Sequence, residues 1–595
     1  MNLTPRPSRN KPQGFALILT LVLIAILLAS YATLMSWVNA NAKITKRNIL
    51  FTQTQSAAES ATELVLATMM RDFNNQALNS ANTYSSATNL PSQAGWPTTY
   101  QFSDTNGTPN STYVTPLGTI GWTQLPARYN GLYGWGQTWE ITSKAIPQSV
   151  GENLSASISQ DVWFGSIPVF QFAIFYNMDL EINPGAAMTI NGKVHANNNI
   201  YATGSGSGTP LTFSDLVEAS GKVNQFASPL DPNNTSRTGN VIFSMRTNNP
   251  VNQASSLSLP VGTNNNPSTV MSVLSIPPAG TVATSPAGQS FIYNLADIII
   301  SNSPAGSNVV YYQNLNTIQG QIQVPMDATN ISAGVTNVYY SFVTNVSFYD
   351  YREAKTVKAI QVDVGKFNTW LSTSVNGRTY NSMNTVGYSS KGHNIDGIYV
   401  YNSIPATSSQ LPAVRLVNGE QLPPGGLSVG TPFPIYIKGN YNVTTNGAKL
   451  STTLGDTTNT YPAAIMGDAV TILSTNWNDA NTSATGLSSR TPISTTINAA
   501  CLEGIVPSNG THYSGGLENF LRLLENWNNS TTTITYNGSI VVLFQSQYAT
   551  GFWNSAIYGV PKRAWGFDPN FMQQNLLPPM TPQVRATIRG NWDTQ

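Results

Sequence analysis

The first 75 residues carry the strongest hydrophobic pattern in the chain. A basic leader of residues 1–14 is followed by an uncharged, mostly apolar run of 25 residues from Gly14 to Val38. As a helix this run would be about 37 Å long, enough to cross a hydrocarbon layer of about 30 Å. We therefore predict a membrane-spanning helix over residues 15–38.

The helical pattern continues beyond the apolar run. No Pro or Gly occurs between Asn39 and Phe73, and apolar side chains there largely follow a spacing of three to four residues. This predicts an amphipathic continuation over residues 39–75. A cleaved secretory signal is the alternative, since small residues suited to cleavage stand at Ser30-Tyr31-Ala32 and at Ala40-Asn41-Ala42. The apolar run is nevertheless longer than the roughly 7–15 residues of such signals.

After residue 160 the pattern changes to short alternating segments typical of strands. Apolar positions recur at steps of about ten residues from Leu180 to Phe213, with Asn and Gly between them. Similar segments return at residues 434–443, 463–473, 495–506 and 534–544. This spacing suits a coiled parallel stack, in which each rung buries its inward side chains against the next. We predict a mainly β body, first a parallel β-helix (solenoid) and second an elaborated sandwich of antiparallel hairpins.

Shorter patterns predict individual β elements. Residues 137–145 and 154–166 alternate in polarity around a turn-like stretch, which predicts an antiparallel pair with Trp139 and Ile141 covering the helix. Eight Asn-Gly pairs favour hairpins in part of the body, most clearly in RLVNGEQL at residues 415–422.

Two further helices are predicted within the body. Residues 364–372 form a short candidate. Residues 516–527 place Leu517, Phe520 and Leu524 on one face, which predicts a helix docked on the body.

These patterns divide the chain into eight parts. The N-terminal parts are a leader at 1–14, a membrane-spanning helix at 15–38 and its amphipathic continuation at 39–75. The β-rich parts are a loop-rich antiparallel head at 76–168, a solenoid-like part at 169–244, a β-rich insertion at 245–345, a second solenoid-like part at 346–559 and a Pro-rich tail at 560–595 that wraps the end of the solenoid.

Composition excludes some classes of function. The 595 residues include 28 Lys and Arg against 27 Asp and Glu, so the formal net charge is +1 and no basic field exists for nucleic acid. Only 9% of residues are charged, but 41% are apolar, which is enough for large cores. The single cysteine, Cys501, excludes an intramolecular disulfide and a metal site built on several thiolates of one chain.

The N-terminal segment resembles a known family. A basic leader, then Gly14-Phe15-Ala16-Leu17-Ile18 opening an apolar helix, and Ala57-Ala58-Glu59-Ser60-Ala61 downstream, resemble type IV prepilins. The likeness is greater to PilX-type pilus assembly proteins and K-type minor pseudopilins. The resemblance implies cleavage after Gly14 by a prepilin peptidase and packing of the helix from Phe15 onward in a helix bundle.

One position departs from the major pilins of that family. They carry Glu at the fifth mature position, where this chain has Leu19. A carboxylate in a membrane helix is costly unless it is paired, and in major pilins it is thought to pair with a neighbouring subunit's N-terminus. Because Leu19 cannot form this pair, the resemblance points to a non-polymerising, initiating or tip-like component.

Catalytic chemistry is sparse in the sequence. His195, His393 and His512 lie far apart without metal-ligand spacing, and we predict solvent-facing turn positions for them. Cys501 sits in an apolar run and is predicted to be a small buried side chain. We therefore predict no metal site, no cofactor and no catalytic residues.

Acidic residues give no clear acid–base pair either. Asp179 and Glu181 share one strand face without a repeated partner on another rung, whereas general acid–base work needs two carboxyls in different environments. The densest charged stretch runs from Asp350 to Lys358 and is predicted to be a solvated strand edge or an internal ion-pair cluster. A patch that binds a partner is a further option.

Together these patterns predict a non-enzymatic, single-pass inner-membrane protein whose body lies in the periplasm or on the cell surface. The expected role is that of a pilus assembly or minor pilin-like component. Its expected partners are the inner membrane and other pilin-like subunits, with a surface glycan as a further candidate and no nucleic acid. The alternative is a membrane-anchored carbohydrate-binding or carbohydrate-active β-helix protein.

Overall fold

The computed structural model describes residues 15–594 apart from short gaps. These gaps are residues 75–77, 79, 86–99, 105, 110, 127–128, 149–153, 205–207, 238, 245–248, 260–265, 268, 286, 305, 314–321, 376–377, 380–392, 446–447, 450–453 and 529–530. The chain forms two compact units. Unit 1 comprises residues 1–119, 137–163 and 588–595, and unit 2 comprises residues 120–136 and 164–587.

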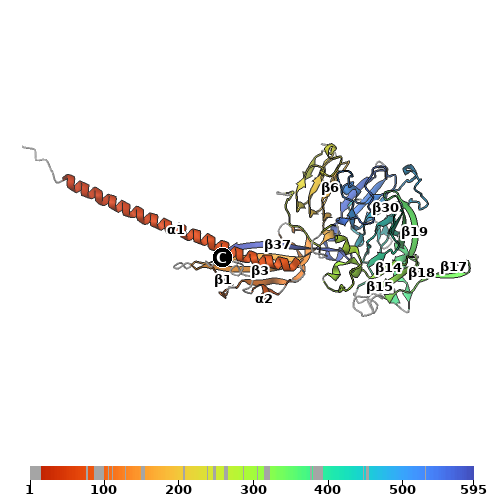
Figure 1. The fold of residues 1–595 in the computed structure, drawn as a ribbon, viewed down its shortest axis with the longest axis horizontal. Coiled ribbons are helices and arrows are strands. Elements are labelled where there is room, and N and C mark those ends of the chain that lie inside the picture. The colour runs from red at the N-terminus through yellow and green to blue at the C-terminus, as the bar shows by residue number, and fades with distance from the viewer. Residues whose placement is uncertain are drawn as a thin grey trace, which may run out of the picture. The chain divides into compact units, whose positions relative to one another are not determined.

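Unit 1 contains the long helix α1, Phe15–Asn74, of 60 residues (Figure 1). One uninterrupted helix confirms the prediction that the apolar run and its amphipathic continuation belong together. Its buried residues fall in the second half: Thr54, Ala57, Ala58, Ala61, Thr62, Val65, Leu66 and Met69. They recur at three- to four-residue spacing, so they form one face of the helix. The short helix α2 is Ala81–Tyr84.

A five-stranded sheet accompanies α1. Its strands are β1 (Tyr100–Ser103), β2 (Tyr113–Gln124), β3 (Tyr133–Pro147), β4 (Ala156–Pro168) and β37 (Gln583–Thr594), in the order β1-β3-β4-β37 with β2 also paired to β3. The chain passes between the two units within β2, β3, β4 and β37.

A small core joins the helix and this sheet. It comprises Ala57, Ala58, Ala61, Phe102, Ala145 and Ile158. The two predicted strands are present as the neighbours β3 and β4, and Trp139 and Ile141 are buried. Alternation along β3 puts both on the same side as Ala145, which packs with the alanines of α1.

The first part of unit 2 is a three-sided coil of short strands. Its turns are β5 (Ile174–Tyr176), β6 (Leu180–Ile182) and β7 (Met188–Ile190), then β8 (Val194–Ala196), β9 (Ile200–Ala202) and β10 (Leu211–Phe213), then β11 (Val217–Ala219), β12 (Val223–Asn224) and β13 (Val241–Phe243). Three parallel ladders, β5-β8-β11, β6-β9-β12 and β7-β10-β13, stack the turns. The apolar positions that recur about every ten residues in the sequence lie on the short strands of this coil.

A second coil follows later in the chain. One ladder contains β14 (Ile298–Asn302), β23 (Gly397–Tyr401), β25 (Leu427–Gly430), β29 (Ala463–Met466), β32 (Ala500–Ile505) and β35 (Ile540–Gln545). The second contains β20 (Lys355–Asp363), β24 (Gln410–Val417), β26 (Ile435–Lys438), β30 (Val470–Leu473) and β33 (Arg522–Leu523), and the third contains β31 (Thr495–Asn498), β34 (Thr533–Gly538) and β36 (Lys562–Phe567). Pairing within all three is parallel.

The two coils form one continuous sheet in an order that the sequence does not follow. Strand β5 pairs in parallel with β8 on one side and with β35 on the other. The order along the sheet is therefore β14-β23-β25-β29-β32-β35-β5-β8-β11. Both coils advance in the same direction, and the coil that comes later in the chain stands first in the stack.

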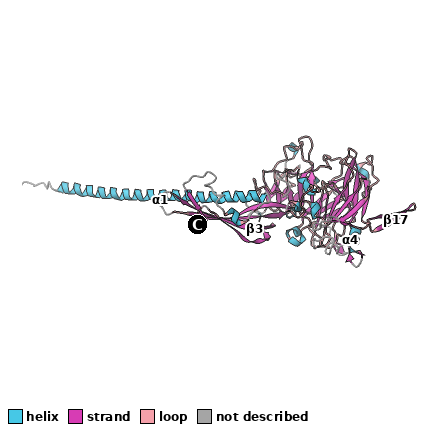
Figure 2. Cartoon of the chain, turned by 60° about the horizontal axis from the view of Figure 1, so that its bottom comes forward, coloured by secondary structure: helices cyan, strands magenta, loops and turns pink. Residues whose placement is uncertain are grey.

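Further strands pair antiparallel, some at the ends of the parallel ladders and some in separate two-stranded sheets. They are β15 (Asn308–Tyr312), β16 (Ile322–Gln323) and β19 (Val343–Asp350), together with the pairs β17 (Ala328–Ser332) with β18 (Val335–Tyr339), β21 (Ser374–Val375) with β22 (Arg378–Thr379), and β27 (Thr444–Thr445) with β28 (Ala448–Lys449). Strands β14, β15 and β16 of the segment predicted as an insertion belong to the main sheet, because β14 pairs with β23. Figure 2 labels β17 and the short helix α4 (Val364–Ser372). A further short helix, α3, is Ile292–Leu295.

Two predicted elements were wrong and one was confirmed. Residues 415–422 are no hairpin, because β24 pairs in parallel with β20 and β26, so both of its edges are occupied. Residues 516–527 are no helix: a 3₁₀ turn at Leu517–Asn519 is followed by β33, which joins the ladder of β30. All apolar residues of the 516–527 segment are buried, although they do not lie on a helix. Pairing of β33 with β30 therefore decided the local structure against the helical spacing of the sequence. The predicted helix 364–372 is present as α4.

Candidate functional site

The first half of α1 is an exposed apolar surface. Every residue from Phe15 to Ile49 is exposed, including Phe15 at 68%, Leu19 at 54% and Val38 at 50%. The described residues contain one helix long and apolar enough to cross a membrane, and it is α1, with a mean hydropathy of 2.6 in its most apolar stretch. Gly14 lies outside the described residues, so processing between Gly14 and Phe15 stays a prediction.

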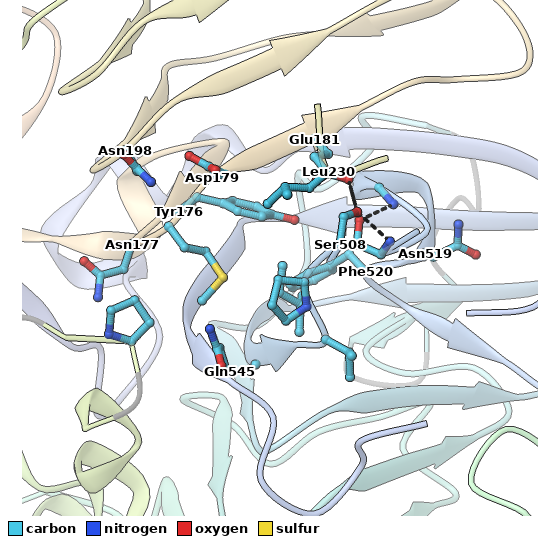
Figure 3. A pocket seen from close by; sticks show the side chains of 18 of the residues that line it. Tyr176, Asn177, Asp179, Glu181, Asn198, Leu230, Ser508, Asn519, Phe520 and Gln545 are labelled. Carbon is cyan, nitrogen blue, oxygen red and sulfur yellow. Dashed lines mark hydrogen bonds between the residues drawn. The ribbon is translucent and has the colours of Figure 1, made fainter. Parts of the chain in front are cut away.

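Unit 2 contains a pocket of about 380 Å³ beside the first coil (Figure 3). Residues 176–181 at the start of that coil line it, together with residues 197–198 of the next turn and the 504–508 segment that ends β32. Arg352, Ser514, Asn519, Arg522 and Gln545 add to its polar lining. The pocket thus draws on parts of the chain that the β5–β35 pairing brings together.

Two carboxyl groups of this pocket lie in different surroundings. Glu181 is buried, and its Oε2 accepts hydrogen bonds from Ser508 Oγ at 2.7 Å and Ser514 Oγ at 2.8 Å. Burial raises the pKa of the Glu181 carboxyl, against these two hydrogen bonds. Asp179 Oδ1 accepts from the Asn199 backbone N–H at 2.9 Å. The sequence interpretation was that Asp179 and Glu181 have no repeated partner on an adjacent rung. In the structure, Asn199 of the next turn donates to Asp179, and the loop with Ser508 and Ser514 binds Glu181.

The basic side of the pocket comes from two arginines. Arg522 Nη1 lies 2.9 Å from Glu353 Oε1, and both side chains are buried. Arg352 Nε donates to the Gly551 carbonyl at 3.0 Å. Burial, together with the positive charge of Arg522, lowers the pKa of Arg352 to about 9. The charged stretch from Asp350 to Lys358 therefore includes an internal ion-pair cluster, which was one of its two predicted forms.

His195 is not a solvent-facing turn residue as predicted. It is fully buried on β8, with Nδ1 2.7 Å from Glu218 Oε1 on β11 and Nε2 2.9 Å from Asn197 Oδ1. The Asn197 amide group donates to the Leu257 carbonyl at 2.7 Å, so its oxygen faces the imidazole. Both ring nitrogens of His195 therefore face acceptor oxygens, one of Glu218 and one of Asn197.

The other histidines are at the surface. His393 Nδ1 lies 3.5 Å from Asp396 Oδ2, and its Nε2 lies 3.8 Å from Asp297 Oδ1. The hydrogen bond with Asp396 and the charge of Asp297 raise the pKa of His393 to about 9, against its partial burial. Ligand atoms of the three residues lie within 4.8 Å of one another, and the protonated imidazole offsets one of the two carboxylate charges. His512 stacks on Phe552 with ring centroids 3.9 Å apart.

Cys501 is buried in the main core, as its apolar surroundings predicted. Burial raises the pKa of its thiol above the ordinary range. A thiol kept protonated in this way is a poor nucleophile.

Comparison with known proteins gives little guidance. No family model matches the chain, and no curated protein matches it. Three chains of solved structures do match, among them the competence-associated pilin ComZ from Thermus thermophilus. That match is 11% identical with a TM-score of 0.24 and covers 91% of this chain and 97% of ComZ. A TM-score this low does not establish a shared fold.

Proposed function

We propose that this protein is a non-enzymatic, membrane-anchored component of a pilus-like assembly, in which α1 holds a large β body outside the cytoplasm. The observation that supports it is the contrast within α1. Its first half is exposed throughout, whereas a face of its second half is buried and packs with β1, β3 and β4. Because an apolar surface of this length is rarely left in water, the first half needs lipid or neighbouring apolar helices.

The resemblance to prepilins refines this proposal. We propose that a prepilin peptidase cleaves after Gly14, so that Phe15 becomes the mature N-terminus. Leu19 then occupies the position where major pilins carry a Glu, and it offers no carboxylate to the N-terminus of a neighbour. An initiating or tip-like subunit, with the inner membrane and other pilin-like subunits as partners, fits such a helix better than a polymerising one.

Processing is tested by producing the full chain together with a prepilin peptidase and sequencing the N-terminus of the membrane fraction. The expected mature chain begins at Phe15. Recovery of Met1 would remove the processing step, and a start near Thr33 or Lys43 would indicate ordinary secretion and contradict the proposal.

Anchoring is tested with paired substitutions in the two halves of α1. Ile24→Arg with Leu27→Arg puts two charges into the apolar half, at a cost of about 5–7 kcal/mol for insertion. Gln53→Arg with Ser56→Arg is the matched control, because both positions are exposed and lie beyond the predicted span. We expect the first variant to leave the membrane fraction and the control to stay. Equal membrane association of both variants would refute the anchor.

A further inference from the structure

The pocket beside the first coil contains polar groups that its own walls do not satisfy. Asp179 Oδ2, Asn198 Nδ2, the Gln545 side-chain amide and the Arg352 Nη atoms have no hydrogen-bond partner among the described residues. In Figure 3, Asp179 and Asn198 lie on one side of the Tyr176 ring and Gln545 lies on the other. Unsatisfied donors and acceptors thus border the same space from several segments.

The walls that hold these groups are fixed by further bonds. Asn197 Nδ2 donates to Asn177 Oδ1 at 2.8 Å, which ties one turn of the coil to the next at the pocket edge. Glu181 holds the 508–514 loop through its two serine bonds. The Arg522–Glu353 pair fixes the basic side. A ligand would therefore meet groups that are already in place, which lowers the entropic cost of binding.

The mixture of charges selects the class of ligand. A carboxylate ligand attracted to the arginines would also lie near Asp179 and Glu181. A cationic ligand attracted to these acids would also lie near Arg352 and Arg522, so each kind of ion meets like charge in the same pocket. An apolar ligand would leave several polar groups without water or partners, at a cost of about 1–3 kcal/mol each. A hydroxyl group both donates and accepts, so it can pair with the Asp179 oxygen and with the Arg352 guanidinium alike.

Size and the remaining lining agree with this class. A volume of about 380 Å³ lies near the small end of the roughly 300–1,000 Å³ range of small-molecule sites. Met178, Leu230 and Ile505 add apolar surface beside the polar groups. A sugar ring presents both hydroxyl edges and C–H faces, and so matches both kinds of lining.

We propose that this pocket binds a neutral, hydroxyl-rich ligand of about one or two sugar rings, recognised by Asp179, Asn198, Arg352 and Gln545. No bond of the ligand is broken in this proposal. All residues that line this pocket belong to unit 2. The binding proposal can therefore be tested independently of the membrane anchor and of leader processing.

The test uses the full chain in detergent and measures binding by calorimetry and ligand-observed NMR. The probes are glucose, galactose, mannose and N-acetylglucosamine with their β1,4-linked disaccharides, each up to about 10 mM, a limit that detects weak binding. Glucuronate and glucosamine serve as the anionic and cationic comparators. At least one neutral probe is expected to bind more tightly than its charged comparator.

Matched variants locate the binding. Gln545→Ala removes a side chain that is exposed and makes no bond to the described residues, so folding is preserved, and affinity should fall about five-fold for one lost neutral hydrogen bond. Asp179→Asn keeps an acceptor for Asn199 and should weaken binding at least as much. Gln547→Ala, two residues from Gln545 and not part of the lining, should leave affinity unchanged.

Three results would overturn the proposal. One is the failure of every neutral probe to bind at the highest concentration. Another is binding that Gln545→Ala and Asp179→Asn leave intact, which would place the sugar elsewhere. The third is tighter binding of glucuronate than of any neutral probe, which would make the pocket an anion site.

Discussion

The buried His195–Glu218 pair allows a direct measurement of how two polar side chains affect the stability of the coil. The two residues face each other in the parallel ladder between β8 and β11. Their column along the sheet is otherwise apolar, running Val541, Phe175, His195, Glu218 and Val251. His195 also stacks on Phe175 with ring centroids 5.4 Å apart. The pair therefore occupies two positions where the neighbouring turns carry hydrocarbon.

His195→Leu removes the imidazole that lies 2.7 Å from Glu218 Oε1 and leaves this carboxyl group without that partner at a fully buried site. Breaking a buried pair from one side costs about 3–5 kcal/mol, a large share of the roughly 5–15 kcal/mol that stabilises a protein. Glu218 Oε2 has no other partner among the described residues, so little can replace the imidazole. Asn197 Oδ1 still accepts from the Leu257 backbone N–H at 2.8 Å, so in the variant Glu218, and not Asn197, is the residue left without a partner.

The double variant His195→Leu with Glu218→Leu removes both buried polar side chains and continues the apolar column. We expect it to lie within about 1 kcal/mol of the parent or above it, because two buried desolvation costs disappear together. The assay is amide hydrogen exchange of peptides that cover β8 and β11, since opening of one region is better defined than global unfolding in a chain of two units. A double variant as unstable as His195→Leu, or a single variant without loss, would refute this reasoning.

Two further predictions concern ionisation. His393 has a pKa of about 9 in the folded chain against about 6.5 unfolded, so its stabilisation is present below about pH 6.5 and is lost as the pH rises to about 9. His393→Gln should flatten thermal stability over that interval, and an unchanged slope would contradict the ion pair. Iodoacetamide should alkylate Cys501 only after denaturation, because the thiol is buried and protonated. Labelling of the folded chain at the denatured rate would show the site to be open.

Strands could be predicted wherever apolar and polar residues alternate within a single turn of the coil. The alternation at 463–473 and 534–544 became β29 with β30 and β34 with β35, because inward positions of each turn are apolar. Side-chain amides at turns also carried information. Asn537 Nδ2 donates to Asn498 Oδ1 at 2.9 Å, so these asparagines tie adjacent turns together. Both signals are local in sequence.

The order of the coils could not be predicted. Nothing in β5 itself shows that β35, more than 360 residues later, will be its neighbour, because a parallel strand accepts any partner with complementary edges and apolar inward residues. The pocket depends on that pairing, since it joins residues 176–181 to residues 504–508 and Gln545. Its residue types were visible in the sequence, but their proximity was not.

The sequence also did not show that many of its few acidic side chains are buried and hydrogen-bonded to loops. Among the described residues, eleven acidic side chains are buried: Glu181, Glu218, Asp231, Asp297, Asp350, Glu353, Asp468, Glu503, Glu518, Glu525 and Asp568. Several of them accept hydrogen bonds from backbone N–H groups of loops far away in the chain. Asp468 Oδ2 accepts from Tyr548 at 3.0 Å, and Glu525 Oε2 accepts from Ser474 at 2.6 Å. A stack of short strands leaves many loop N–H groups to satisfy, and a carboxylate accepts several at once. Buried acids of this chain therefore hold loops against the coil through hydrogen bonds. Asp179 Oδ1 is bonded to Asn199 in the same way, and the proposed ligand contact of Asp179 uses its other oxygen, Oδ2.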